Sequence, residues 1–245
     1  MVITNLKNQV IGFCGYAGVG KDTAFRMMEK LFPQLRGHRV AFADELKADV
    51  QKCIDALKAL GIDTETVEFK DKFREMWVSW GHVSRSFDPL IWVKRANPAI
   101  NELKQRGWVF ITDVRYYNEI VTLRREKKAT IFFIDRPDHY PANEEEAASF
   151  GEIMNNAHEL FDPHGGFYFK NDGTPEELGE KIKARICELF NIIITKSECA
   201  ACHSVVETEL KQCARCGKFV CPSCLVLDFI RNERRCKDCN KSTGV

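Results

Sequence analysis

Short apolar runs alternate with amphipathic stretches along the first 190 residues, as in a sheet that helices cover on both faces. Residues 10–14 form the first apolar run, and residues 38–42, 107–112, 130–134 and 166–169 form four more. Strands that are buried on both faces are nearly continuous in apolar residues, and the helices between them connect parallel neighbours. We therefore predict a doubly wound parallel α/β sheet, with ligands at the carboxyl ends of its strands.

The segments between the runs show helical periodicity. Residues 24–31 follow the first run as a helix, and a second helix is expected from about residue 45 to residue 60. A charged, aromatic-rich helical region covers roughly residues 67–105. Residues 137–156, rich in Glu and Ala, are expected to be a mobile or helical insertion.

The last helix of this part carries its own start signal. Thr174 is a suitable N-cap, Pro175 occupies the first helical position, and Glu177 completes a capping box. We expect this helix to run to about Phe190.

A glycine-rich turn, Gly-Tyr-Ala-Gly-Val-Gly-Lys-Asp-Thr at residues 15–23, joins the first run to the first helix. Glycines let successive backbone N–H groups curl around phosphate oxygens, and the helix N-terminus adds partial positive charge. Gly15, Gly20 and Lys21 fit G-x-x-x-x-G-K, with Asp22 where Ser or Thr normally ligates magnesium. The alternative is an ordinary turn followed by a surface lysine.

A second polar cluster follows the third apolar run. Asp113 lies where that strand ends, so its carboxylate would face the same crevice as the glycine-rich turn. There it would hold the magnesium shell or orient the attacking group, while Arg115 would clamp a phosphate with two hydrogen bonds. In the alternative, Asp113 caps the next helix and Arg115 pairs with Glu119 on its surface.

Two further stretches are candidates for an acceptor site. Asp44 and Lys47 follow the second run, where Asp44 is also a suitable helix cap. Basic and aromatic residues alternate between residues 69 and 95, a mixture that suits a monophosphate and a stacked base or a single-stranded nucleic acid. An amphipathic helix that buries aromatics and exposes lysines is the simpler alternative. These residues are Phe69, Lys70, Lys72, Phe73, Arg74, Trp77, Trp80, Arg85, Phe87, Trp92, Lys94 and Arg95.

Composition narrows the class of protein. The chain has 245 residues, is 44% hydrophobic and carries a formal net charge of +1, which gives no general basic bias toward nucleic acid. Its first residues lack a basic start followed by a long apolar run, and no apolar stretch approaches membrane-spanning length. We expect a soluble, cytoplasmic protein.

The eleven cysteines are unevenly placed. Cys14, Cys53 and Cys187 are scattered, and we expect them to be small buried apolar residues. The other eight form four C-x-x-C pairs, which in a chain without an export signal favour zinc over disulfides. Eight thiolates suit two closed, structural zinc sites, and about fifty residues need the metal because they build too small a core. The eight are Cys199, Cys202, Cys213, Cys216, Cys221, Cys224, Cys236 and Cys239.

Residues 8 to 190 resemble the deoxynucleoside monophosphate kinases of bacteriophages and large viruses. The matching segments are GYAGVGKDT, AFADELK, FREMWVSWGHVSRSFDPLIWVKR, VFITDVRYYNE, IDRPD and FKNDGTPEEL, in the expected order. Asp commonly follows the loop lysine in this family, so Asp22 supports the resemblance. No Gln lies between Arg74 and Gly81, where the family pattern has one, which leaves the accepted base open.

The resemblance implies transfer of the ATP γ-phosphate to a deoxynucleoside monophosphate, with Mg²⁺. A lid would exclude water during the transfer. Whether Asp22 or Thr23 contacts magnesium stays open. By the resemblance, ATP would be held by Gly15, Gly18, Gly20, Lys21, Asp22, Thr23 and Asn171. The acceptor would be held by Asp44, Lys47, Arg74, Trp80, Arg85 and Arg115, and the catalytic residues would be Lys21, Asp113, Arg115 and Arg136.

The cysteine-rich tail resembles a FYVE-type or related cross-brace zinc finger. The resemblance implies that cysteine pairs one and three share one zinc and pairs two and four the other; two successive ribbons are the alternative. The basic lipid-binding motif of FYVE domains is replaced here by residues 209–212, Glu-Leu-Lys-Gln. Residues 196–245 carry nine Lys and Arg against six Asp and Glu, which becomes nearly neutral with eight thiolates and two zinc ions. A protein-binding or purely stabilising module is therefore favoured over a nucleic-acid or lipid binder.

We thus predict a two-domain enzyme, with a P-loop kinase domain at residues 1–193 and an eight-cysteine zinc module at residues 194–245. One alternative is a P-loop kinase of another small phosphorylated acceptor. Another is a zinc-finger adaptor whose kinase domain binds nucleotide without turnover. The oligomeric state stays open, a dimer being compatible with the sequence.

Overall fold

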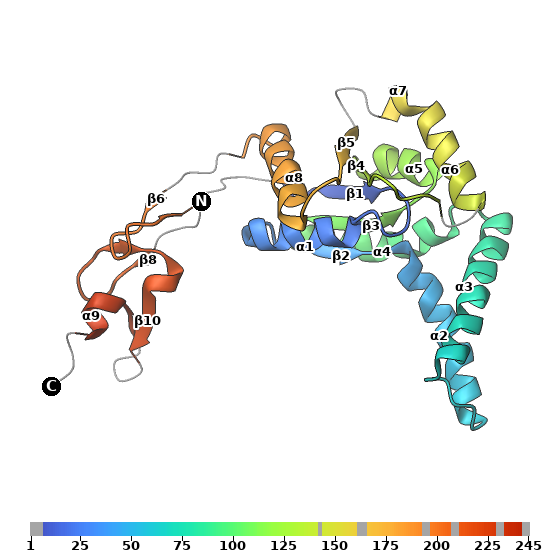
Figure 1. The fold of residues 1–245 in the computed structure, drawn as a ribbon, viewed down its shortest axis with the longest axis horizontal. Coiled ribbons are helices and arrows are strands. Elements are labelled where there is room, and N and C mark those ends of the chain that lie inside the picture. Colours follow the sequence, from blue (N-terminus) through green and yellow to red (C-terminus); the bar gives the residue numbers. More distant parts are fainter. Residues whose placement is uncertain are drawn as a thin grey trace. The chain divides into compact units, whose positions relative to one another are not determined.

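The computed structural model describes residues 7–141, 144–160, 166–192, 197–206, 211–228 and 233–241. The chain divides into two compact units, one comprising Lys7–Lys183 and the other containing the chain from Ala184 onward (Figure 1). Helix α8 (Pro175–Leu189) runs across this division. The predicted domain boundary after residue 193 therefore stays a prediction.

Five parallel strands form the sheet of the first unit, in the order β2-β3-β1-β4-β5 (Figure 1). This order places β1 and β3 side by side, so the segments that follow these two strands open at the same edge of the sheet. The predicted doubly wound parallel sheet is confirmed. The strands are β1 (Val10–Cys14), β2 (His38–Val40), β3 (Val109–Val114), β4 (Thr130–Asp135) and β5 (Gly166–Lys170).

Helices cover both faces of the sheet, with α1 and α5 on opposite sides (Figure 1). Helices α2 and α3 lie side by side and extend away from the sheet (Figure 1). None of the helices in the described part of the chain is both long and apolar enough to cross a membrane. The helices of this unit are α1 (Lys21–Leu31), α2 (Phe42–Ala59), α3 (Val67–Phe87), α4 (Ile91–Arg106), α5 (Tyr117–Lys127), α6 (Glu144–Asn155), α7 (Ala157–Leu160) and α8, with a 3-10 turn at Pro33–Leu35.

The core explains why the strands are nearly all apolar. Successive residues of β1 face opposite sides of the sheet, and every one of them is buried. On one side the ring of Phe13 stacks on that of Phe110, with centroids 5.9 Å apart, and also packs against Phe132. On the other side Val10 and Cys14 join an aliphatic cluster with Ile111, Ile131 and their neighbours. This packing fixes the strand ends from which the loops emerge.

The sequence misplaced some element bounds. Strand β2 ends at Val40, and α2 begins at Phe42 rather than near Glu45, because the carboxylate of Asp113 accepts hydrogen bonds from the first backbone N–H groups of that helix. The region expected to be helical over residues 67–105 is two helices that separate around Pro89. Cys53 is exposed on α2, which corrects its expected burial.

The predicted start of α8 is confirmed. The side-chain oxygen of Thr174 accepts from the backbone N–H of Glu177 at 3.2 Å, and the Glu177 carboxylate accepts from the Thr174 N–H at 2.8 Å. The helix ends at Leu189, one residue before the expected end. The Glu- and Ala-rich insertion contains α6, so its described part is largely helical.

The second unit contains short antiparallel strand pairs and a small cysteine core. Strand β6 pairs with β7, β8 with β9, and β10 with β11. Buried cysteines surround Val220 in place of a larger apolar core. The elements are β6 (Ser197–Glu198), β7 (Val205–Val206), β8 (Lys211–Gln212), β9 (Phe219–Val220), a 3-10 turn at Pro222–Cys224, β10 (Leu225–Asp228), β11 (Glu233–Cys236) and α9 (Lys237–Lys241).

Candidate functional site

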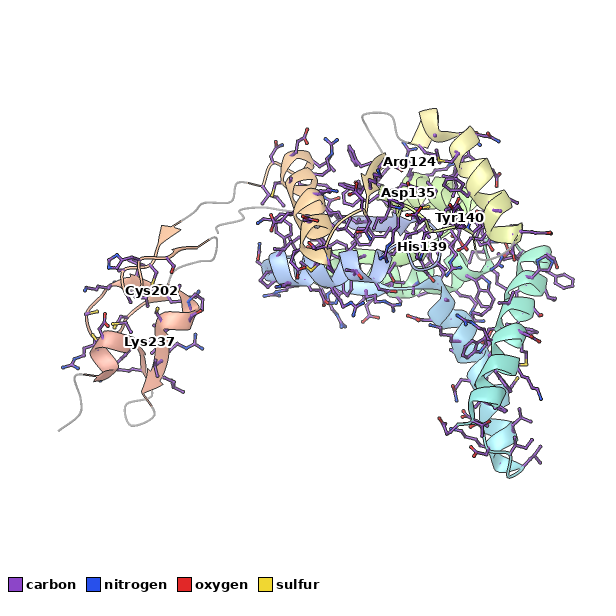
Figure 2. All side chains as sticks on the ribbon, viewed as in Figure 1. Arg124, Asp135, His139, Tyr140, Cys202 and Lys237 are labelled. Carbon is purple, nitrogen blue, oxygen red and sulfur yellow. The ribbon has the colours of Figure 1, made fainter. Side chains whose placement is uncertain are left out.

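The glycine-rich turn between β1 and α1 has a backbone that requires glycine. Gly15, Gly18 and Gly20 have φ values of 139°, 78° and 107°, in the region that side chains disfavour. A Cβ atom on Gly15 would lie 2.3 Å from the carbonyl oxygen of Ile134, and one on Gly18 would lie 2.6 Å from a ring nitrogen of His139, which Figure 2 labels. The turn is therefore closely packed on β4 and the segment that follows it.

Lys21 is buried at the start of α1 rather than exposed on the surface. Its ammonium donates hydrogen bonds to the carbonyl oxygen of Gly15, at 2.7 Å, and to that of Tyr16. Burial, together with the nearby charge of Arg115, lowers the pKa of Lys21 from 10.5 to about 8. The cation thus lies inside the turn, where it can reach a phosphate group held by the loop.

The lowered pKa of Lys21 predicts that nucleotide binding weakens above about pH 8. A bound phosphate favours the ammonium form and raises its pKa, so binding takes up a proton in this range. The dissociation constant for a non-hydrolysable ATP analogue should increase by up to about tenfold per pH unit above pH 8. Titration calorimetry from about pH 7 to about pH 9.5 measures this, and a constant affinity across that range would contradict it.

Asp22 and Asp44 are linked through a residue that the sequence analysis missed. The guanidinium of Arg39 lies 3.1 Å from the carboxylate of Asp22 and 2.8 Å from that of Asp44, while Lys47 lies 3.7 Å from Asp44. Arg39 is the charged residue inside the second apolar run, which is the signal that could have identified it. Its two ion pairs fix Asp22 beside the loop, next to Thr23.

Asp113 connects the end of β3 to the start of α2. Its two carboxylate oxygens accept from the backbone N–H groups of Phe42 at 2.8 Å and Ala43 at 2.7 Å. The alternative that Asp113 caps the next helix is wrong, because it caps an earlier helix instead. Burial raises the pKa of Asp113, although these two N–H donors oppose the change.

Glu119 shapes the turn that carries Arg115. Its buried carboxylate accepts from the backbone N–H groups of Arg115 at 2.9 Å and Tyr116 at 3.1 Å. Burial raises the pKa of Glu119 to about 7. The alternative that the Arg115 side chain pairs with Glu119 is wrong, since the guanidinium contacts Glu146 at 3.3 Å.

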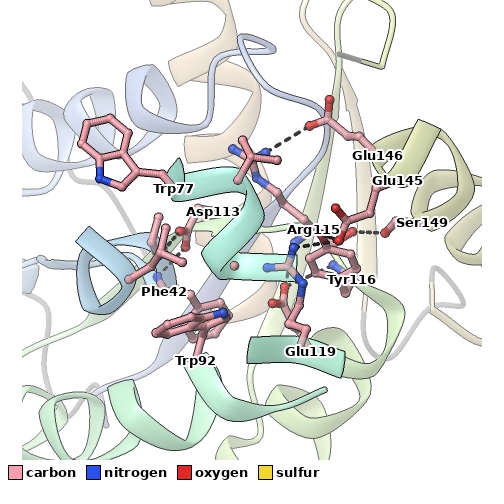
Figure 3. A pocket seen from close by; sticks show the side chains of 15 residues that line it. Phe42, Trp77, Trp92, Asp113, Arg115, Tyr116, Glu119, Glu145, Glu146 and Ser149 are labelled. Atoms are coloured by element: carbon pink, nitrogen blue, oxygen red, sulfur yellow. Dashed lines mark hydrogen bonds and ion pairs between the residues drawn. The ribbon is translucent and has the colours of Figure 1, made fainter. Parts of the chain in front are cut away.

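A pocket of about 200 Å³ lies beside Asp113 and Arg115 (Figure 3). Phe42, Trp77 and Trp92 supply aromatic walls, and Figure 3 shows them with Asp113 on one side of the pocket and Tyr116, Glu145 and Glu146 on the other. The guanidinium of Arg85 lies 4.6 Å above the Tyr116 ring. The charged residues that line the pocket are Arg85, Arg115, Asp113, Glu119, Glu145 and Glu146.

Two adjacent carboxylates from the first turn of α6 enter this pocket. Glu145 accepts hydrogen bonds from Arg85 at 2.7 Å and from the Tyr116 hydroxyl at 2.6 Å. Glu146 accepts at one oxygen from the backbone N–H of Ala17, at 2.8 Å, and from the guanidinium of Arg115 (Figure 3). The sequence analysis missed both; three consecutive Glu residues inside the insertion were the available signal.

Two predicted acceptor residues, Arg74 and Trp80, and the predicted catalytic residue Arg136 are not among the residues that line this pocket. Arg74 lines a different pocket, of about 480 Å³, together with Phe73 of α3 and residues of α2. Trp80 is 47% exposed, and Arg136 is exposed immediately after β4. The structure therefore brings Arg85 and Arg115 together, and their roles in binding stay a prediction.

Asn171, predicted to lie near the adenine, supports the loop. Its side-chain amide donates to the carbonyl oxygen of Val19 at 2.8 Å and lies next to Gly20. The residue therefore adjoins the glycine-rich loop, and its contact with a base stays a prediction.

The eight clustered cysteines form two groups of four. The first pair joins the third and the second pair joins the fourth, as the cross-brace resemblance implied, and not as two successive ribbons. Within each group the sulfur atoms all lie within 4.8 Å of one another. The groups are Cys199, Cys202, Cys221 and Cys224, and Cys213, Cys216, Cys236 and Cys239.

These groups fit tetrahedral zinc. Backbone N–H groups point at the sulfurs: Cys221 donates to the sulfur of Cys199, and Cys236 to that of Cys213, each at 3.2 Å. Such donors stabilise thiolates, the form that binds zinc. His203 is exposed and belongs to neither group. Four sulfur ligands leave no open position, which indicates structural metal sites.

The strand order and the loop define a parallel P-loop α/β fold, and the second unit is a cysteine-rich module. No protein-family model matches the sequence, and no curated protein matches it. Among solved structures, a dephospho-CoA kinase from Campylobacter jejuni is 11% identical over 76% of this chain and 100% of its own, with a TM-score of 0.46. A sugar kinase from Janibacter sp. HTCC2649 is 13% identical over 73% and 94%, with a TM-score of 0.41. The shikimate kinase from Aquifex aeolicus is 15% identical over 74% and 98%, with a TM-score of 0.39. At these identities the likenesses do not identify an activity.

Proposed function

We propose that the chain is an ATP-dependent phosphotransferase that acts on a deoxynucleoside monophosphate or a closely related nucleotide. The observation that carries the proposal is the position of the aromatic pocket beside the glycine-rich loop. One carboxylate oxygen, that of Glu146, contacts both the N–H of Ala17 in the loop and the guanidinium of Arg115 in the pocket. The Ala17 N–H and the Arg115 guanidinium, one anion-binding group from each half of the site, therefore donate to the same oxygen atom.

The chemistry requires alignment and charge neutralisation rather than a covalent intermediate. The loop N–H groups and Lys21 hold the outer phosphates of the donor, while Arg115 and Arg85 orient the acceptor phosphate. Magnesium would supply further charge neutralisation, with Asp22, Thr23 and Asp113 as the nearby oxygen donors. Both oxygens of Asp113 retain a lone pair after accepting from α2, so this carboxylate fits the outer shell of the metal.

The walls of the pocket favour a planar acceptor. Trp77 and Trp92 present large flat surfaces, suited to stacking against a base. A nucleotide base offers such a stacking face.

Two alternatives remain distinct from this proposal: a kinase of another small phosphorylated acceptor, and an adaptor with an inactive nucleotide-binding domain. The buried position of Lys21, the partly buried position of Asp113 and the placement of Arg115 in the pocket support an active enzyme. For the second unit we propose two structural zinc ions, with a stabilising or protein-binding role.

The test is ADP release from ATP in the presence of a panel of deoxynucleoside monophosphates, other phosphorylated small molecules and unphosphorylated sugars. We expect turnover with at least one deoxynucleoside monophosphate. Turnover only with a different phosphorylated compound would replace the acceptor class. Tight binding of an ATP analogue without turnover of any acceptor would overturn the enzyme proposal in favour of the adaptor.

A further inference from the structure

The acceptor pocket contains too much negative charge for a second phosphate. Its lining provides two guanidinium groups, those of Arg85 and Arg115, against four carboxyl groups. Protonation of Glu119, whose pKa is about 7, offsets one of these charges only in part. A dianionic phosphate needs net positive charge around it, so some of the carboxylates must give up their contacts when such an acceptor binds.

Glu145 and Glu146 are the two carboxylates that can leave. Asp113 and Glu119 bind backbone N–H groups that begin helices, and those groups would lose their caps. Glu145 and Glu146 instead bind Arg85, the Tyr116 hydroxyl, Arg115 and the Ala17 N–H, all of them donors that suit phosphate oxygens.

Residues farther along α6 are held by contacts of their own. A substrate phosphate can therefore replace the two carboxylates when only their side chains move and the helix stays in place. The Ser149 hydroxyl donates to the carbonyl oxygen of Arg115. The ring of Phe150 packs against Tyr16, with centroids 4.6 Å apart, and against Phe133 at 5.7 Å. Carboxylates in the first turn of a helix also stay favourable in solvent, because they face the positive end of the helix dipole.

We infer that Glu145 and Glu146 are placeholder anions, which keep the phosphate-binding groups in position and are displaced when substrate phosphates bind. Glu146 stands between the two halves, bound to the loop N–H of Ala17 and to Arg115, and is displaced by the ATP phosphates, whereas Glu145 stands in the acceptor half and is displaced by the monophosphate. The identity of the two displacing ligands, ATP and the monophosphate, rests on the proposed function. A phosphate must therefore compete with a carboxylate at each position.

The test is binding rather than turnover. Glu146→Gln keeps an oxygen for the Ala17 N–H but removes the charge, so a non-hydrolysable ATP analogue should bind about tenfold more tightly than to the wild type. Glu145→Gln should tighten binding of a deoxynucleoside monophosphate by a similar factor and leave the ATP analogue unchanged. Glu144→Gln is the matched control, because Glu144 is exposed in the same helical turn. Thermal unfolding verifies that each full-length variant is folded.

The outcomes separate this inference from the proposed function. If Glu146 is a fixed structural link, Glu146→Gln will weaken the ATP analogue or leave it unchanged, and the inference is overturned while turnover persists. If both variants bind their ligands more tightly but no acceptor is turned over, the inference about Glu145 and Glu146 is supported and the proposed enzyme activity is overturned. A chain in which neither the wild type nor the Glu146→Gln variant binds the analogue overturns both.

Discussion

Replacing Lys21 with methionine is expected to lower kcat for phosphoryl transfer by a factor of about a thousand or more. The ammonium lies inside the glycine-rich loop and is the cation nearest to the donor phosphates in the proposed complex. A single preorganised group that stabilises developing charge typically contributes a factor of about a hundred to a thousand. A full positive charge opposite a triphosphate should be at or beyond the upper end of that range. Steady-state ADP release with the best acceptor measures the effect.

The same variant should fold at least as well as the wild type. The lowered pKa of Lys21 means that burying its charge costs roughly 3 kcal/mol of folding free energy below about pH 8. This cost is relieved between about pH 8 and the unfolded-state pKa near 10.5, where the wild type should become more stable as the pH rises. Methionine removes the charge and keeps a side chain of similar length. Lys30→Met, at an exposed position of the same helix, is the control. Retention of wild-type turnover by Lys21→Met would overturn the assignment, and its zinc content should stay at two per chain.

The sheet and the loop could be predicted because their signals are local. An apolar run, a glycine-rich turn and a helix follow one another within residues 10–31, so their pattern can be read from a short stretch of sequence. The capping box of Thr174 and Glu177 is likewise set by residues three apart. In both cases the signal lies within a short stretch of sequence, even though β1 takes its backbone partners from β3 and β4.

The rest of the site depends on contacts between distant segments. Asp113 sets the start of α2 from seventy residues away, and Glu146 reaches the loop from 129 residues away. The sequence pattern cannot reveal such pairs, because the residues around an acidic side chain are the same whichever helix start it caps. For a related reason, the sequence predicted Trp80 as the acceptor-binding residue, although Trp77 lines the pocket. Residues three apart on a helix lie close together on its surface, so only the packing of α3 decides that Trp77 lines the pocket while Trp80 is half exposed.

Replacing Cys213 with serine is expected to remove both zinc ions from the second unit, not one. Removing one of four thiolates weakens its own site, and each structural zinc contributes about 10–16 kcal/mol to folding, more than a small unit can lose. The two sites also interleave, since Cys213 and Cys216 lie in sequence between the two halves of the other group. Losing the metal at Cys213 frees the hairpin of β8 and β9, which leads directly into Cys221 of the first group.

Zinc per chain, measured by mass spectrometry after brief exposure to a mild chelator, should therefore fall from two to well below one. Trypsin should then cut at Lys211, Arg215 or Lys218, within or beside the freed hairpin. Cys53→Ser is the matched control, because Cys53 is an exposed cysteine outside both groups, and it should retain two zinc ions and resist the protease. A Cys213→Ser chain that keeps one zinc with undiminished chelator resistance would show that the two sites fold independently. That result would contradict the interleaved arrangement as the source of the unit's stability, because the described residues of the module build only a small apolar core to couple its two halves.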